Sequence, residues 1–226
     1  MRAADKGDSD KVMVLLNAGA RVAMADKQGR PLKIFIMAGQ SNMQGKARVS
    51  TIERLTLTED SKQLYQDMMV KDGLPSAVKD AYAVYFSGDP VHGPLKPGYG
   101  DETNKNPNFG PDYTFGIYMQ KHLNEPILII KTAWGGKSLA KDFRPPSSGG
   151  EVGTYYTQIV QLSKDVLSRL KDIFPAYDGR GYELAGFGWH QGWNDRVNQA
   201  FNDEYEKNLA NFIRDIRKDL GAAKLP

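Results

Sequence analysis

The sequence predicts an α/β fold, a three-layer α/β/α sandwich around a parallel sheet, and three observations support this. From Lys33 onward, apolar runs typical of buried strands alternate with helical amphipathic patterns. Three of these strands are each followed by a polar segment that contains glycine. The length of 226 residues suits one such domain with a small appendage. Because ligands of such sheets bind beyond the carboxyl ends of the strands, we expect the functional site there.

The strands and helices follow from two different periodicities. The first strand is a continuous apolar run, as expected of a strand buried on both faces. Helices are predicted where apolar residues recur every three or four positions. The predicted strands are 34–38, 81–86, 126–130 and 182–189, and the predicted helices are 112–123, 155–174 and 199–220.

Two segments, 87–111 and 142–153, are rich in glycine, proline or polar residues and show no periodicity. Loops of this length in a compact domain are usually functional or disordered. Two interpretations stay open for each: it lines a substrate cleft, or it is a plain surface loop.

The first 32 residues have a different character. Asp8 offers a helix N-cap, and Val12, Leu15 and Leu16 give one apolar face. This stretch resembles the second half of an ankyrin repeat, and 26–32 resembles the hairpin that opens the next one. One repeat cannot bury its own apolar face, so the resemblance implies further repeats and a possible protein partner. The alternative is a short amphipathic helix packed on the main domain. We therefore expect an ankyrin-like fragment at 1–32 and a second domain at 33–226.

Composition excludes several classes of protein. Lys plus Arg is 30 and Asp plus Glu is 27, so the net charge of +3 predicts neither a nucleic-acid nor a membrane partner. The absence of cysteine excludes disulfides, a thiolate nucleophile and a cysteine zinc site. No apolar run approaches the ~20 residues that span a bilayer, and the N-terminus lacks the apolar core of a signal peptide. Localisation stays undetermined, since Met1 need not be the natural start.

The first strand-end segment, 38–46, carries the candidate nucleophile. Five residues separate Gly39 from Gly45, where a phosphate-binding loop needs four, so nucleotide binding is rejected. Met43 also replaces the second glycine of a G-x-S-x-G nucleophile elbow. Ser41 still follows a buried strand, where a hydroxyl is well placed to attack an ester. Taken alone, it is more typical of a turn or helix-capping serine than of a nucleophile.

The other two segments favour the catalytic interpretation. Acyl transfer needs a nucleophile and several hydrogen-bond donors aimed at one oxyanion. Gly135 or Gly136 offers a backbone N–H, and Gln191 and Asn194 offer side-chain amides. A nucleophile, a glycine turn and an amide at three strand ends form the constellation of an SGNH-type esterase.

The blocks 36–43, 131–138 and 189–195 resemble the sialate O-acetylesterase and acetylxylan esterase group, carbohydrate esterase family six of the SGNH hydrolases. The resemblance runs from Lys33 to the end of the chain. It implies a flavodoxin-like three-layer fold that removes acetyl groups from an acetylated carbohydrate without a metal or other cofactor. It also implies that Ser41 is the nucleophile. The implied oxyanion and substrate residues are Gly136 or its neighbour Gly135, Gln191 with Asn194 as the fallback, and Gln40 and His190 from the same blocks.

Two departures from the family pattern matter. Trp193 stands where many relatives have Glu, and this indole either stacks on a sugar or is buried as a core or lid residue. The family also takes its base from a C-terminal Asp-x-x-His motif, which this sequence lacks. We therefore expect a C-terminally incomplete esterase domain with little or no turnover. The rival is His190 acting as base with Asp195 nearby in sequence.

The remaining candidates are weaker. His122 lies near a helix C-terminus and His92 lies in a long loop. Several aromatic residues are either sugar platforms or core: Tyr99, Tyr113, Trp134 and Trp193. A different class of function stays open, a non-catalytic glycan-binding or protein-interaction module with a decayed esterase site.

Overall fold

The computed structural model describes residues 31–226 except 69, 72–73, 88, 102–106, 176, 178 and 180. The ankyrin-like fragment lies outside the described residues, apart from the two before Lys33. Its structure and its separation from the second domain therefore stay predictions.

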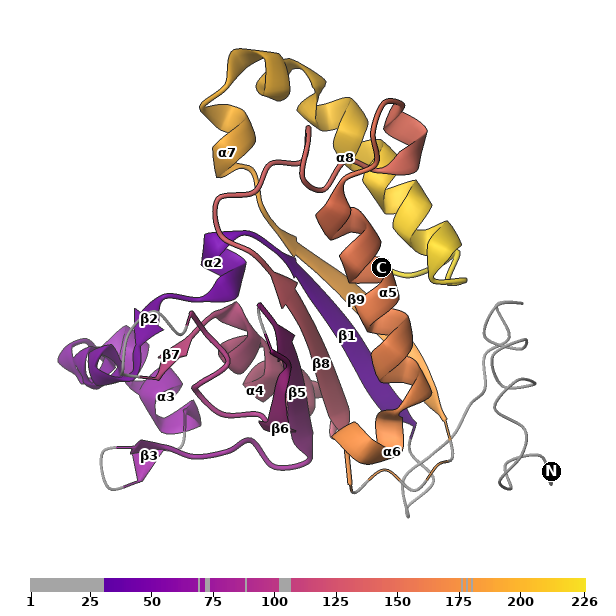
Figure 1. The fold of residues 1–226 in the computed structure, drawn as a ribbon. Helices are drawn as coiled ribbons and strands as arrows, with labels where there is room; N and C mark the ends of the chain where they lie inside the picture. The colour runs from indigo at the N-terminus through magenta and orange to yellow at the C-terminus, as the bar shows by residue number, and fades with distance from the viewer. Residues whose placement is uncertain are drawn as a thin grey trace. The chain divides into compact units, whose positions relative to one another are not determined.

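The described chain contains both helices and strands, and the five strands β3 to β7 follow one another without a helix between them (Figure 1). The strands are β1 (Leu32–Gly39), β2 (Ala47–Arg48), β3 (Val70–Lys71), β4 (Leu74–Pro75), β5 (Ala81–Phe86), β6 (Val91–Pro94), β7 (Asn108–Phe109), β8 (Ile127–Ala133) and β9 (Tyr182–His190). The helices are α2 (Ser41–Gln44), α3 (Glu59–Asp67), α4 (Pro111–Leu123), α5 (Thr154–Ser168), α6 (Leu170–Ile173), α7 (Trp193–Arg196) and α8 (Gln199–Asp219), with 3-10 helices at Val49–Leu57 and Pro146–Ser148.

The central sheet has five strands in the order β6-β5-β8-β1-β9 (Figure 1). β5 pairs in parallel with β8, so that Tyr85 lies opposite Lys131. The predicted α/β fold, a mostly parallel sheet flanked by helices, is confirmed. One edge corrects the purely parallel expectation, because β6 pairs antiparallel to β5. β6 falls in the segment 87–111 that was predicted to be a loop, since its residues Val91–Pro94 show no apolar alternation.

Burial explains why the strands could be predicted from the sequence. β1, β5 and β8 are buried along nearly their whole length, as continuous apolar runs predict. β8 stays buried even through Lys131 and Thr132, beyond the predicted end of the strand. β9 is half-buried up to Trp189 and exposed at His190, which suits the last strand in the sheet order.

The helices lie close to their predicted ranges, with one correction. α4 begins with Pro111 at its first turn and ends at Asn124, whose left-handed backbone terminates it. The helix predicted at 155–174 is two helices, because the backbone at Arg169 leaves the helical region (φ −123°, ψ 30°). The apolar spacing continues across this break, so periodicity alone did not reveal it.

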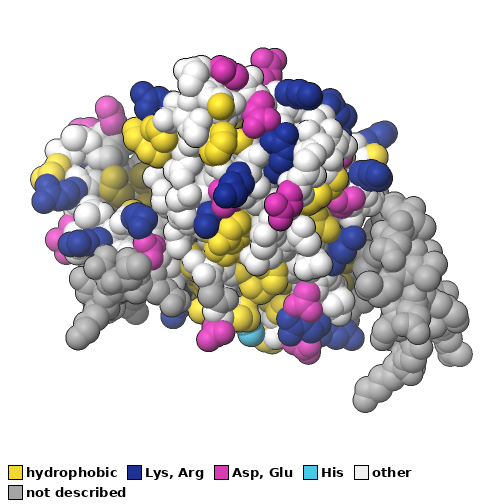
Figure 2. All heavy atoms as spheres, turned by 45° about the horizontal axis from the view of Figure 1, so that its top comes forward, with side chains coloured by type: hydrophobic (Ala, Val, Ile, Leu, Met, Phe, Trp, Pro, Cys, Tyr) yellow, Lys and Arg dark blue, Asp and Glu magenta, His cyan; other side chains and the backbone are white. Residues whose placement is uncertain are grey.

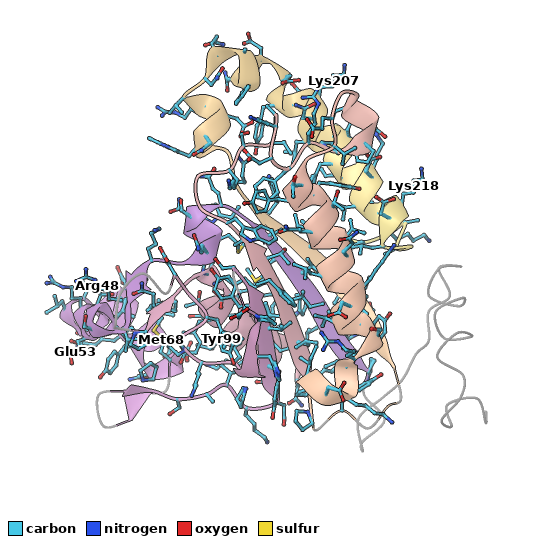
Figure 3. The ribbon with its side chains drawn as sticks, in the orientation of Figure 1. Arg48, Glu53, Met68, Tyr99, Lys207 and Lys218 are labelled. Atoms are coloured by element: carbon cyan, nitrogen blue, oxygen red, sulfur yellow. The ribbon has the colours of Figure 1, made fainter. Side chains whose placement is uncertain are left out.

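The chain divides into two compact units. The Ser41 unit contains 35–136 and 188–191, and the α8 unit contains 137–187, 192–226 and the described residues before Phe35. In the Ser41 unit, α4 packs on the sheet through an edge-to-face contact of Phe115 with Phe35, with ring centroids 5.0 Å apart. Arg48 and Glu53 project outward in this unit, whereas Tyr99 lies near the strands (Figure 3).

In the α8 unit, Phe212 of α8 is the centre of an aromatic cluster. Its ring centroid lies 5.7 Å from that of Tyr156 on α5 and 5.9 Å from that of Phe187 on β9. The Phe187 N–H donates to the carbonyl of Pro226 at 2.9 Å, so the last residue lies along β9. Lys207 and Lys218 point away from α8 (Figure 3).

The surface of the described residues carries charges of both signs. Figure 2 shows Lys and Arg side chains interspersed with Asp and Glu on one face. The helices that the structure describes include none with the length and apolarity to cross a membrane.

Candidate active site

The carboxyl ends of β1, β8 and β9 meet in the Ser41 unit. The Trp134 N–H, just after β8, donates to the Gly39 carbonyl at 3.1 Å. The Gln40 N–H donates to the His190 carbonyl at 3.2 Å. The three blocks singled out in the sequence are therefore joined by backbone hydrogen bonds at one edge of the sheet, as parallel strands require.

Ser41 is the first residue of α2, a helix of four residues that follows β1 directly. Its side chain is half-buried, and Gln40 before it is only 4% exposed. Gly39 makes this turn possible, because a Cβ at that position would lie 2.2 Å from the His190 carbonyl oxygen. The strand end thus fixes the backbone that carries the candidate nucleophile.

Gly135 lies directly against Ser41. A Cβ built on Gly135 would lie 3.8 Å from the Ser41 Cβ and 3.0 Å from the Gln44 Oε1. Gly136 follows with a φ of +73°, the left-handed region that favours glycine. Both glycines are exposed. The turn after β8 therefore presents bare backbone beside the candidate nucleophile, as an oxyanion donor requires.

The two amide candidates belong to different units. Gln191 follows β9 and is the last residue of this part of the Ser41 unit, half-buried with its amide oxygen buried. Asn194 lies on α7 in the α8 unit. The structure therefore brings Gln40, Ser41, Gly135 and the backbone of His190 together, whereas Asn194 belongs to the other unit.

The three histidines have distinct positions. His92 is exposed on β6, opposite Val84, and His122 is exposed in the last turn of α4. Only His190 lies at the carboxyl end of a strand, with its side chain exposed. Its carbonyl accepts the Gln40 N–H, so its backbone shapes the turn that carries Ser41.

Asp195 is buried and holds a loop. One carboxylate oxygen accepts the Leu139 N–H at 2.9 Å and the other accepts the Ala140 N–H at 2.8 Å. Both oxygens are thus engaged with the backbone after the Gly135–Gly136 turn. This contact gives Asp195 a structural role that its position next to Asn194 did not suggest.

The described residues 98–101 and 108–110 pack against the turn that carries Ser41. The Asp101 N–H donates to the Gly45 carbonyl at 2.8 Å, and a Cβ on Gly45 would lie 2.3 Å from the Gly110 nitrogen. Lys46 pairs with the Asp101 carboxylate. This part of 87–111 is thus no plain surface loop, and its predicted contact with a substrate stays a prediction.

A buried ion pair lies below this segment, and sequence reasoning missed it. The Lys131 Nζ lies 2.7 Å from the Asp112 Oδ1, and both side chains are at most 1% exposed. The same ammonium donates to the Tyr99 carbonyl and lies 4.8 Å from the centre of the Tyr85 ring. Burial lowers the pKa of Lys131 and raises that of Asp112, while the attraction between the two charges opposes both shifts.

Gln44 was also missed. Its Nε2 donates to the Ser87 Oγ at 2.9 Å, which links α2 to the end of β5. Burial raises the pKa of the Tyr85 hydroxyl, and the nearby Ser87 and Gln44 side chains oppose that rise. Only the position of Gln44 three residues after Ser41 was available as a sequence signal.

The aromatic residues that were candidate sugar platforms differ in how exposed they are. Tyr99 and Tyr113 are core residues, 4% and 0% exposed, and burial raises the pKa of each hydroxyl to about 12. Trp134 is half-buried. Trp193 is 61% exposed, with the Arg196 guanidinium carbon 4.9 Å from its ring centre, so the buried interpretation of Trp193 is wrong.

The segment 142–153 is held by side chains of α8. Arg144 donates to the Glu204 carboxylate at 3.0 Å and to the carbonyls of Ala140 and Gly149. The Asp215 carboxylate accepts the Ser147 N–H at 2.8 Å.

Among the described residues, no group of three or more His, Asp or Glu is placed to hold a metal ion.

Comparison with known families gives a match over most of the chain. The family model for a carbohydrate esterase, the sialic acid-specific acetylesterase, matches residues 31–226. A search of curated proteins found no match.

Solved structures share the fold. A protein from Arabidopsis thaliana is 20% identical with a TM-score of 0.55, over 87% of this chain and 72% of that one. A carbohydrate acetylesterase from Xanthomonas citri is 16% identical with a TM-score of 0.51, over 85% of this chain and 40% of that one. At these identities the likeness shows an SGNH hydrolase-like fold alone.

Proposed function

Because the chain belongs to the sialic acid-specific acetylesterase family of carbohydrate esterases, we propose that it is a serine-dependent carbohydrate O-acetylesterase. The observation that carries this proposal is the approach of Gly135 to Ser41, with 3.8 Å between the Ser41 Cβ and the point where a Gly135 Cβ would lie. A hydroxyl beside bare backbone at a strand end is the minimum that acyl transfer needs.

In the proposed reaction, the Ser41 hydroxyl attacks the acetyl carbonyl and loses its proton to a base. The carbonyl oxygen becomes an oxyanion, which the backbone N–H groups of the Gly135–Gly136 turn and the Gln191 amide stabilise. The sugar hydroxyl leaves with a proton, and water then releases acetate from Ser41. Asn194 is the alternative amide donor, and Gln40 holds the turn through its bond to His190.

The rate of turnover depends on whether a general base is present beside Ser41. The C-terminal Asp-x-x-His motif of the family is missing, since the Asp89-x-x-His92 of this sequence lies near β6, so we propose that this chain on its own has little turnover. A base is commonly worth ~10²–10⁴ in rate. His190 is the rival base at this edge of the sheet. The two Asp195 carboxylate oxygens accept hydrogen bonds from the Leu139 and Ala140 N–H groups, which argues against Asp195 as the partner of the His190 imidazole.

The proposed substrate is an acetylated sugar, either a sialic acid or a plant-type polysaccharide, as in carbohydrate esterase family six. The exposure of Trp193 supports a sugar contact, because a flat indole face stacks on sugar rings and exposed tryptophans are uncommon. The ankyrin-like fragment at 1–32 would add a protein partner, and neither nucleic acid nor a membrane is proposed.

The second candidate is a non-catalytic glycan-binding module with a decayed site. The absence of the family's motif from the C-terminal part of this sequence and the exposed Trp193 favour it. It differs from the first in one respect that is simple to measure, the dependence of ester hydrolysis on Ser41.

The test compares the chain with its Ser41→Ala and His190→Ala variants on 4-nitrophenyl acetate, with and without imidazole as an external base. After subtraction of the protein-free rate, which includes the direct attack of imidazole on the ester, we expect slow hydrolysis that imidazole accelerates and that Ser41→Ala abolishes. Fast hydrolysis without imidazole, lost in a folded His190→Ala variant, would instead assign His190 as the base. Binding of an acetylated sugar with no Ser41-dependent hydrolysis under either condition would support the glycan-binding module.

A further inference from the structure

We propose that Gln44 is a positioning residue, whose hydrogen bond to Ser87 fixes the Gly135 turn against the Ser41 hydroxyl. The inference rests on the proposed function, in which Ser41 is the nucleophile and the Gly135–Gly136 turn stabilises the oxyanion. It adds two side chains, Gln44 and Ser87, that lie outside the three blocks of the family resemblance.

The backbone places Gln44 on the same rigid turn as Ser41. The two residues are the first and last of α2, and the Gln44 N–H donates to the Gln40 carbonyl at 2.8 Å. The side chain of Gln44 therefore starts from a point fixed relative to the nucleophile. The hydrogen-bond partner of its amide group then sets the direction of the side chain.

The amide of Gln44 spans the end of the middle strand. In the sheet order, β8 lies between β5 and β1. Gln44 follows β1, and its Nε2 bonds the Ser87 Oγ at 2.9 Å, just after β5. Its Oε1 lies 3.0 Å from where a Gly135 Cβ would be, above the end of β8. The side chain thus crosses the Gly135 turn and is anchored on its far side.

The anchor matters because a glutamine side chain is flexible. A free glutamine has several rotamers, and ordering it has an entropic cost that the bond to Ser87 offsets. In the anchored rotamer the amide occupies the space beside the Gly135 Cα that a side chain would fill. The turn then has less room to move away from Ser41, and oxyanion donors lose effect when displaced by about 1 Å.

A double-mutant cycle tests this link. Gln44→Met keeps the length of the side chain and removes both hydrogen-bonding atoms, and Ser87→Ala removes the anchor. We expect each to slow first-turnover release of 4-nitrophenolate, with imidazole present, by about 10-fold, with KM changed less than twofold. The double variant should be no slower than either single one, because both remove the same bond.

Three controls accompany the cycle. Ser87→Thr keeps the hydroxyl and should retain the rate. Gln199→Met removes an amide that bonds the Asp203 carboxylate at 2.6 Å on α8, and should change nothing. Urea unfolding of each variant separates a loss of positioning from a loss of fold.

The outcomes distinguish this inference from the proposed function. An unchanged rate in Gln44→Met and Ser87→Ala, with the rate abolished by Ser41→Ala, would overturn the role of Gln44 and leave the esterase proposal intact. Additive losses in the double variant would likewise overturn it. A rate that does not depend on Ser41 would overturn both.

Discussion

In the Ser41 unit, the turn after β1 is held by backbone against backbone, at glycines where a side chain has no room. In the α8 unit, the loop at 137–153 is held by side chains that bond its backbone, above all Asp195, Arg144 and Asp215. The first arrangement depends on a few close approaches that any Cβ disrupts. The second divides the same task among several hydrogen bonds, each of modest strength.

The largest effect is expected at the buried ion pair of the Ser41 unit. Lys131→Met leaves the Asp112 carboxylate buried without its partner and should lower the free energy of unfolding by about 3–5 kcal/mol. Lys33→Met is the matched control in the α8 unit, because Lys33 pairs at 2.7 Å with Glu183, which is 40% exposed. It should cost less than about 1 kcal/mol in urea unfolding, and equal losses would contradict the comparison.

The next effect is expected at Gly39. Gly39→Ala places a Cβ 2.2 Å from the His190 carbonyl oxygen, so β1 and β9 must shift, at a cost of about 3 kcal/mol. Gly149→Ala in the α8 unit is the control, because its φ is +73° and nothing lies within 4 Å of the added Cβ. Strain alone should cost about 1 kcal/mol there. Thermal unfolding of both variants measures the difference, and a Gly39→Ala protein as stable as Gly149→Ala would refute the close approach.

A smaller effect is expected when the α8 unit loses one side-chain contact. Asp195→Asn replaces one of two accepting oxygens with an N–H₂ group that faces a backbone N–H. The loss should be about 2 kcal/mol, with faster amide hydrogen exchange at Leu139 or Ala140 and unchanged exchange in the Ser41 unit. Protection lost across both units would show instead that the loop is not held separately.

The smallest effect concerns pH. The Lys121 hydrogen bond holds the pKa of Asp67 below its ordinary value of 3.8. A depressed pKa in the folded state adds stability above that ordinary value, and the contribution is lost as pH falls through the folded-state pKa. Lys121→Met should therefore cost about 0.5–1 kcal/mol at pH 7 and almost nothing at pH 2. A difference that persists at pH 2 would show that packing, not charge, links the two side chains.

A structural feature could be predicted from the sequence when neighbouring residues determine it. Apolar runs predicted β1, β5, β8 and β9, because burial on a sheet leaves a mark on neighbouring residues. The meeting of Ser41 with Gly135 followed from their places at strand ends. The break at Arg169 and the strand β6 leave no such mark, since the first keeps its apolar spacing and the second has none.

Contacts between distant segments were not predictable in the same way. Lys131 directly follows the predicted strand 126–130, and only the structure shows that its ammonium is buried against Asp112 and the Tyr99 carbonyl. The bond between Gln44 and Ser87 joins residues 43 positions apart. Each depends on strand order, which the periodicity of one chain segment does not contain.

The position of Lys131 in the chain has a consequence for synthesis on the ribosome. Tyr99 and Asp112 precede it, by 32 and 19 residues, so both emerge before the ammonium that binds them. Until β8 has been translated, the Tyr99 carbonyl and the Asp112 carboxylate lack the Lys131 ammonium and need water as their partner. Translation at roughly 5–20 residues per second makes that interval about one to several seconds. During this interval the residues that will support Ser41 are accessible to chaperones and proteases. Burial of the Lys131 ammonium against them ends this accessibility.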